Sequence, residues 1–131
     1  MTDRRPDRVY GIVTRDGRAF LVERDGSLTL PGGVFRPLAD NRKTELKAHL
    51  FDQLGIDARN IWAQGAFDYQ APGEERAWFS GFYTVWEWAG EPPTGTGRWL
   101  TKDEVAETDG LPAALRTLLL SVLDSVPMRT R

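Results

Sequence analysis

The sequence contains no cysteine, which excludes disulfide bonds and thiolate metal ligands. It has a single histidine, and one imidazole does not make a metal site by itself. No apolar run approaches the roughly 20 residues that a membrane-spanning helix needs. The first residues, MTDRRPDRVY, lack the apolar stretch of a signal peptide. We therefore expect a cytoplasmic protein that neither is secreted nor binds a membrane.

The chain also lacks a strong excess of one charge, since 17 basic and 19 acidic side chains give a formal charge of −2. Binding to nucleic acid or to an anionic membrane requires a clustered basic surface, so neither partner is expected. A length of 131 residues with 40% hydrophobic residues is typical of one soluble domain with a real core. We predict a single domain over residues 1–131, with its core at residues 8–125.

Strand patterns lie on both sides of one helical segment. Arg8–Thr14 and Arg18–Glu23 read as two strands joined by Asp16 and Gly17, a strong hairpin signal. Residues 78–88, WFSGFYTVWEW, are apolar on both faces, which is typical of a strand inside a sheet. Because most strands are linked as hairpins, the element order favours an α+β fold.

The helices have recognisable ends. Asp40 or Asn41 can cap the helix that runs to Gly55, and Gly55 suits a left-handed C-terminal residue. Before this helix, PGG at residues 31–33 forms a loop whose glycines let main-chain N–H groups approach a ligand. Thr101 and Glu104 have the spacing of a capping box, and a last helix is predicted over Pro112–Ser125.

Three segments, GRAFLVERDGSLTLPGG (17–33), LFDQLGI (50–56) and GRWLTKDEV (97–105), together resemble the Nudix (MutT-like) hydrolase superfamily. The resemblance covers roughly residues 8–123. It implies a Nudix-like α/β/α sandwich around a mixed, mostly hairpin-linked sheet. It also implies descent from enzymes that hydrolyse nucleoside diphosphates linked to another group, with a nucleotide or another phosphorylated small molecule as partner.

The family motif is G-x5-E-x7-R-E-U-x-E-E-x-G-U, where U is a bulky aliphatic residue, and this chain keeps only part of it. Matched backwards from its end, the motif meets Ile56, Gly55, Gln53, Asp52, Leu50, His49, Ala48 and Asp40. Mg²⁺ prefers anionic oxygen ligands and binds poorly through imidazole or a neutral amide. With this degenerate Nudix box, we expect ordinary Mg²⁺-dependent pyrophosphate hydrolysis to be lost or severely weakened.

A rebuilt cation site is the alternative. At about 100° per residue, Glu45, His49 and Asp52 fall within about 60° of one another on the helix surface. These ligands suit Mn²⁺, Co²⁺ or Zn²⁺ better than Mg²⁺. Under this alternative the chain is an active divergent hydrolase, with Asp52, Glu45 and Asp40 as catalytic carboxylates. The competing interpretation is that these residues form only the solvated face of the helix.

Basic residues indicate a third arrangement, in which phosphate is held without a metal. Arg36 and Arg42 could grip it with their guanidinium groups, together with the N–H groups of Gly32 and Gly33. They could equally be solvated surface charges. The sequence therefore leaves three classes open: an active hydrolase, a nucleotide-binding module without turnover, and a structural protein. A homodimer through the aromatic strand at 78–88 is compatible with the sequence, as is burial of that strand within one chain.

Overall fold

The structure is a computed structural model that describes residues 6–36 and 41–125. Asp40, one of the predicted catalytic carboxylates, lies outside these residues. The described elements are β1 (Arg8–Arg15), β2 (Arg18–Arg24), β3 (Ser27–Thr29), β4 (Gly32–Val34), α1 (Arg42–Leu54), β5 (Asp57–Tyr69), β6 (Trp78–Ala89), β7 (Gly97–Thr101), α2 (Lys102–Glu107) and α3 (Ala113–Ser125).

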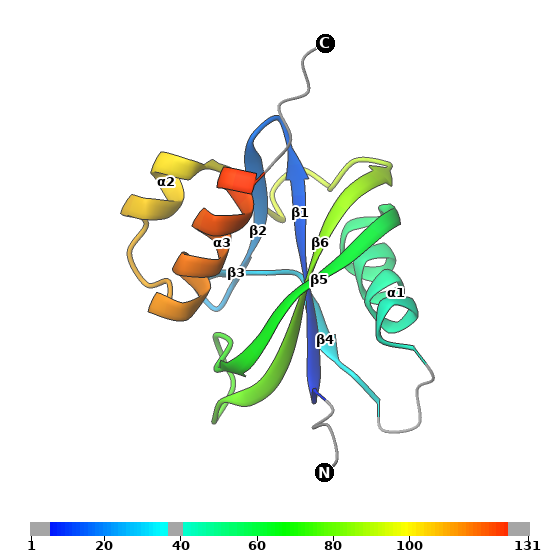
Figure 1. Cartoon of the computed structure of the whole chain (residues 1–131), viewed down its shortest axis with the longest axis horizontal. Helices are drawn as coiled ribbons and strands as arrows, with labels where there is room; N and C mark the ends of the chain where they lie inside the picture. The colour runs from blue at the N-terminus through cyan, green and yellow to red at the C-terminus, as the bar shows by residue number, and fades with distance from the viewer. Residues whose placement is uncertain (1–5, 37–40, 126–131) are drawn as a thin grey trace.

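The strands form one mixed sheet. Strands β3, β2, β1, β6 and β5 follow one another, while β4 pairs with β1 and β7 pairs with β2. β1 and β6 are parallel, and the remaining pairs are antiparallel. Helix α1 lies on one side of the sheet and helices α2 and α3 on the other (Figure 1). This arrangement confirms the predicted α+β, Nudix-like sandwich.

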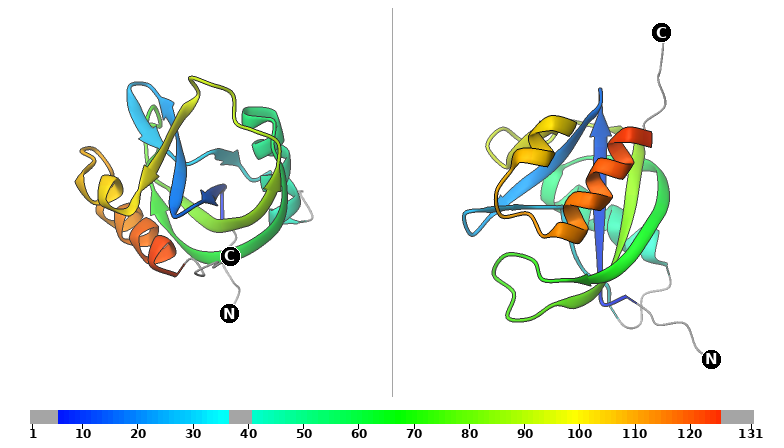
Figure 2. Two further views of the ribbon diagram at one scale, coloured as in Figure 1. Left: turned by 90° about the horizontal axis from the view of Figure 1, so that it is seen from above. Right: turned by 60° about the vertical axis from the view of Figure 1, so that its left-hand side comes forward.

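Strand β6 occupies the sheet interior, as its two apolar faces predict. It lies between β1 and β5, and both long strands β5 and β6 curve strongly around the molecule (Figure 2). Successive side chains of a strand point to opposite faces, so Phe82 and Val85, both fully buried, belong to different core clusters. None of the described helices is long and apolar enough to cross a membrane.

The sheet separates two hydrophobic cores. The cluster on the α1 side contains three fully buried leucines at helical spacing, Leu46, Leu50 and Leu54. The cluster on the α3 side contains Leu115 and Leu119 and several aromatic rings of the sheet. Because both faces of the sheet are buried in this way, α1 is held rigidly against β1 and β4.

The boundaries of α1 agree with the prediction. The Asn41 side chain accepts hydrogen bonds from the N–H groups of Lys43 (2.8 Å) and Thr44 (3.2 Å), so Asn41 is the N-cap. Gly55 ends the helix in the left-handed conformation at φ 69°. The predicted capping box of Thr101 and Glu104 is also present, at the start of α2.

The two-glycine segment differs from the prediction, because it forms strand β4 rather than a loop. Its residues pair with the first half of β1, Gly33 opposite Val9 and Gly32 opposite Tyr10. Gly32 has a φ of 151°, and a Cβ atom there would overlap the Val9 carbonyl oxygen and the Tyr10 backbone. Glycine is therefore needed for this close strand pairing, which local sequence patterns could not reveal.

Candidate functional site

One face of α1 is joined to β4 and the residues after it by three polar side chains, which we call the polar ladder. Its rungs are the pairs Gln53–Gly32, His49–Val34 and Glu45–Arg36. Along the helix the rungs lie four residues apart, and along the extended segment they lie two apart in the opposite direction. Four helical residues rise about 6 Å and two extended residues about 6.6 Å, so the two spacings match.

The first rung uses both ends of the Gln53 amide. Its Nε2 donates to the carbonyl oxygen of Gly32 at 2.8 Å, and its Oε1 accepts from the N–H of the same residue at 3.1 Å. The site is partly buried, where an unpaired backbone group is costly. A glutamate could accept the N–H but could not donate to the carbonyl. The rung therefore requires an amide.

The second rung is formed by His49, whose Nε2 lies 2.8 Å from the carbonyl oxygen of Val34. A carbonyl oxygen can only accept, so Nε2 carries the proton. The ring also packs on Gly33, because a Cβ atom built on that glycine would lie 3.0 Å from the His49 Cε1 atom. The imidazole thus lies between a backbone acceptor and a glycine where a larger residue would crowd the ring.

The third rung is an ion pair between Glu45 and Arg36. The guanidinium donates to both carboxylate oxygens, at 2.9 Å from Nε and 3.0 Å from Nη2. The Glu45 side chain is only 9% exposed, whereas that of Arg36 is 73% exposed. The hydrogen-bonded carboxylate raises the pKa of Arg36. Arg36 therefore covers a carboxylate that would otherwise be buried without a cation.

These contacts decide which groups remain for a divalent cation. Both oxygens of Glu45 face Arg36, Nε2 of His49 faces Val34, and the Gln53 amide faces Gly32. Asp52 is an exposed residue of α1. Across residues 6–36 and 41–125, no group of three or more histidine, aspartate or glutamate side chains could hold a metal ion. The structure does not bring Glu45, His49 and Asp52 together as a cation site, and the donor set does not fit Mg²⁺.

The residues predicted to bind phosphate are divided between different contacts. The Gly32 N–H is used by Gln53, Gly33 lies under the His49 ring, and Arg36 is paired with Glu45. Arg42 lies at the start of α1, close enough to the Tyr83 side chain to affect its pKa. Burial raises the pKa of Tyr83, and this guanidinium partly offsets the rise.

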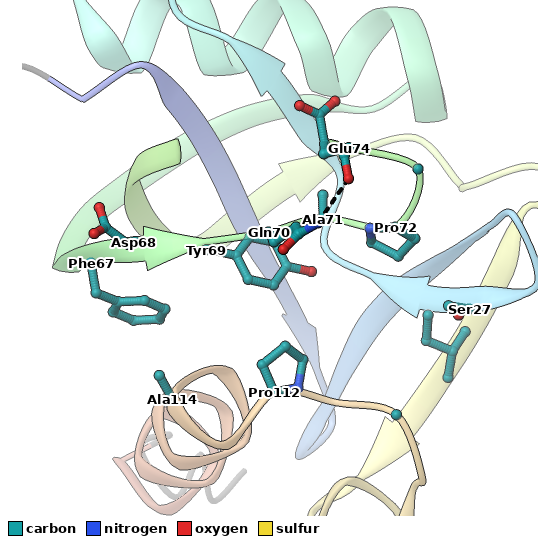
Figure 3. Close-up of a pocket in the computed structure, with 13 residues that line it drawn as sticks. Ser27, Phe67, Asp68, Tyr69, Gln70, Ala71, Pro72, Glu74, Pro112 and Ala114 are labelled. Carbon is teal, nitrogen blue, oxygen red and sulfur yellow. Dashed lines mark hydrogen bonds between the residues drawn. The ribbon is translucent and has the colours of Figure 1, made fainter. Parts of the chain in front are cut away.

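A cavity of about 510 Å³ lies on the other face of the sheet, between the end of β5, β3 and the start of α3. Figure 3 shows the Phe67 ring turned toward Pro112 and Ala114, with the carboxylates of Asp68 and Glu74 turned away. The lining is polar and apolar in about equal shares, with two aromatic rings, and it includes no lysine or arginine among the described residues. Two aromatic rings without a nearby cation suit an uncharged ring better than a phosphate group.

The Tyr69 hydroxyl holds one wall of this cavity in place through a 2.5 Å hydrogen bond to Thr29, on β3. The loop after β5 is fixed as well, because Gln70 donates to the carbonyl oxygen of Glu74 at 2.9 Å. Glu74 in turn pairs with Arg8 at 3.2 Å. Contacts from β5 and the loop after it to β3 and β1 thus hold this side of the cavity in place.

Sequence reasoning missed the roles of Gln53 and of the Glu45–Arg36 pair. The i, i+4, i+8 spacing of Glu45, His49 and Gln53 was a usable signal, because it marks one face of a helix. The complementary signal was the alternation of residues 32, 34 and 36. Neither pattern identifies the partner, since that requires β4 to be placed against β1.

Comparisons with known proteins identify solved structures with the same fold. No protein-family model and no curated protein matches the sequence. Among solved structures, a MutT Nudix hydrolase from Burkholderia pseudomallei superposes with a TM-score of 0.70 at 21% identity, covering 89% of this chain and 97% of that one. The MutT protein from Bacillus halodurans has a TM-score of 0.69 at 25% identity, covering 90% and 82%. The E. coli ORF135 protein has a TM-score of 0.70 at 20% identity, covering 94% and 93%. The chain therefore has the Nudix fold of the MutT-type proteins.

Proposed function

We propose that this chain descends from nucleoside-diphosphate-X hydrolases, binds a nucleotide or another phosphorylated small molecule, and has lost or severely weakened Mg²⁺-dependent pyrophosphate hydrolysis. The observation that carries the proposal is the pair of bonds between the Gln53 amide and Gly32. The position that the resemblance assigns to a cation-binding glutamate holds a neutral amide, and both its polar atoms are already bonded to backbone.

Hydrolysis of a pyrophosphate needs a cation for a chemical reason. The polyphosphate repels hydroxide, and a divalent cation neutralises the anion and supplies a bound, acidified water. The described part of α1 offers the exposed Asp52 but no converging set of acids. Without a cation at this turn, an attacking water is neither activated nor positioned, and turnover is expected to be negligible.

Ligand binding is supported by the cavity beside Phe67 and Tyr69. Two aromatic side chains in a lining that also offers polar groups match the ring of a nucleotide-like molecule. Arg42, at the N-terminal end of α1, is a separate candidate for phosphate binding, because it lies on the opposite side of the sheet from this cavity. The cavity and Arg42 are therefore alternative ligand sites, and substitutions test each of them separately.

The first experiment is a phosphate-release screen over nucleoside triphosphates, ADP-ribose, dinucleotide polyphosphates and sugar nucleotides, each with Mg²⁺, Mn²⁺, Co²⁺ or Zn²⁺. The expected result is no cation-dependent release above the protein-free rate. Release with Mn²⁺, Co²⁺ or Zn²⁺ that is lost in both Glu45→Gln and His49→Ala would establish the rebuilt cation site instead. Brisk release with Mg²⁺ would overturn the proposal.

The second experiment measures thermal stabilisation by the same compounds in a chelating buffer. Ala114→Phe fills the cavity and should abolish the stabilisation, while Ala113→Phe, on the same exposed helical turn but outside the cavity lining, should leave it unchanged. Arg42→Gln should weaken the stabilisation if the phosphate is held at the start of α1, and it should leave the stabilisation unchanged if the ligand lies in the cavity. If no compound stabilises the wild-type protein, the structural interpretation replaces this one.

A further inference from the structure

Strand β4 has a strand partner on only one side. It pairs with β1, and no other strand flanks it in the described part of the chain. The Pro31 carbonyl and the Phe35 N–H bond to β1-side residues, Gly11 and Asp7. Because backbone groups alternate along a strand, those of Gly32 and Val34 point to the opposite, unpaired edge. That edge needs other partners.

The polar ladder supplies those partners. Gln53 satisfies the N–H and the carbonyl of Gly32, and His49 satisfies the carbonyl of Val34. Two side chains of α1 thus bond to the Gly32 N–H and to the carbonyls of Gly32 and Val34, as part of what a neighbouring strand would do. A divalent cation bound between α1 and the Gly32 end of this edge would take the Gly32 carbonyl oxygen as a ligand. In this chain the Gln53 N–H already occupies that oxygen.

We propose that the polar ladder holds β4 against α1 without a divalent cation, and that the Gln53 amide keeps a cation out of the space between residue 53 and the Gly32 carbonyl oxygen. If residue 53 were a glutamate, a carboxylate oxygen would face the Gly32 carbonyl oxygen with no proton between them. Two oxygens in this relation repel each other, and a divalent cation between them would turn repulsion into coordination. An amide at residue 53 therefore disfavours binding of the ion, whereas a carboxylate would favour it.

Arg36 has a comparable role at the opposite end of the ladder. Glu45 is buried, and the only positive group bonded to its carboxylate in the described residues is the Arg36 guanidinium. The chain thus provides an internal cation where an isolated buried carboxylate would attract an external one. The polar groups at both ends of the ladder therefore have partners within the protein and need no metal ion.

The inference extends the proposed function and concerns the same helix face, but it is tested without any substrate. Thermal unfolding is followed for the wild-type protein, Gln53→Glu, Gln53→Ala and Gln64→Glu, in EDTA and in excess Mn²⁺ or Mg²⁺. Gln64 is exposed on β5, so Gln64→Glu makes the same amide-to-acid change away from the ladder. The melting temperature of the wild-type protein should differ by no more than about 1 °C among these buffers, and so should that of Gln64→Glu.

Gln53→Glu should lose roughly 5 to 10 °C in EDTA and regain at least about half of that with Mn²⁺. Gln53→Ala should lose stability and regain none of it with either ion. A wild-type protein that is destabilised by EDTA, or a Gln53→Glu protein indifferent to Mn²⁺, would overturn the inference.

Hydrogen exchange covers the case in which Gln53→Glu does not fold. The Gly32 N–H should be protected in the wild-type protein in EDTA and should exchange faster in Gln53→Ala, while equal rates would count against the ladder. None of these measurements depends on catalytic turnover. If the wild-type protein showed cation-dependent hydrolysis but cation-independent melting, the proposed function would be contradicted and the inference about the ladder would not.

Discussion

The guanidinium of Arg36 meets the carboxylate of Glu45 through two parallel hydrogen bonds of 2.9 Å and 3.0 Å. Removing Arg36 alone leaves the buried carboxylate without its cation, so Arg36→Gln should lower the melting temperature by several degrees. The double variant Arg36→Gln, Glu45→Gln should be more stable than Arg36→Gln, because the uncompensated charge is gone. Melting temperatures of the four proteins of this double-mutant cycle measure the coupling. Additive effects would show that the pair contributes little.

Thr84 and Thr29 are both fully buried, but only one of them has a hydrogen-bonded hydroxyl. The Thr84 hydroxyl has no partner in the described residues, whereas that of Thr29 bonds to Tyr69. Thr84→Val should therefore leave stability unchanged or raise it by about 1 kcal/mol. Thr29→Val should lower it by about 1–3 kcal/mol, because Tyr69 loses its partner. Urea unfolding of both variants gives the comparison, and equal losses would contradict it.

Arg116, on α3, donates to four backbone carbonyls around the end of α2. Nη1 bonds to Val105 and Ala106 at 2.8 Å each, and Nη2 bonds to Thr108 at 2.8 Å and Leu111 at 3.4 Å. Two of these carbonyls lie in the last turn of α2 and two in the segment after it, where carbonyls lack partners within the helix. Arg116→Met should cost about 2 kcal/mol of unfolding free energy, and Arg116→Lys should recover only part of it, because one ammonium cannot reach all four.

The control for Arg116 is Arg98→Met, which removes an exposed arginine from β7 and should change stability by less than about 0.5 kcal/mol. Guanidinium chloride unfolding distinguishes the two variants. Similar losses in both would mean that the Arg116 bonds do not stabilise the α2–α3 connection.

Alkaline pH should destabilise the protein through its buried phenols. Burial, with a smaller contribution from neighbouring Tyr69, raises the pKa of Tyr10 from 10.0 to about 12. A raised pKa means that the folded protein favours the neutral phenol. The contribution is therefore complete below pH 10.0 and is lost as the pH rises from there to about 12. The difference between a pKa of 10.0 and one of about 12 corresponds to about 2–3 kcal/mol of unfolding free energy.

Tyr10→Phe tests this pH dependence, because it keeps the ring that stacks on Phe82 and removes the ionisable group. Unfolding free energies at about pH 8 and about pH 11 should differ less in Tyr10→Phe than in the wild-type protein. Burial also raises the pKa of Tyr69 and of Tyr83, so part of the alkaline loss should persist. Parallel curves for the two proteins would show that Tyr10 does not titrate in this range.

Features that depend on near neighbours in the chain were predictable. Asn41 as N-cap, Gly55 as left-handed C-cap and the Thr101–Glu104 box are confirmed. The interior position of β6 followed from its two apolar faces, and the structural neighbours confirm the Nudix fold. The loss of the acidic motif positions was also visible, although its consequence for catalysis stays a prediction.

Features that depend on distant segments were not predictable in the same way. β4 is a strand only because β1 presents an edge to it, and Gly32 must be glycine only because Val9 lies so close. The fold also gives Arg36 a single buried acid as partner, where the sequence favoured a phosphate ligand or a solvated charge. The cavity beside Phe67 is assembled from three regions far apart in the chain.

The sequence by itself determined the helix ends, the β1–β2 hairpin, the interior strand β6 and the absence of the usual acids, since each of these depends on residues close together in the chain. Only the tertiary structure decided that His49 and Gln53 serve the backbone of β4. A polar side chain has no fixed role until packing places a donor or an acceptor within about 3 Å of it, and packing is set by contacts between distant parts of the chain.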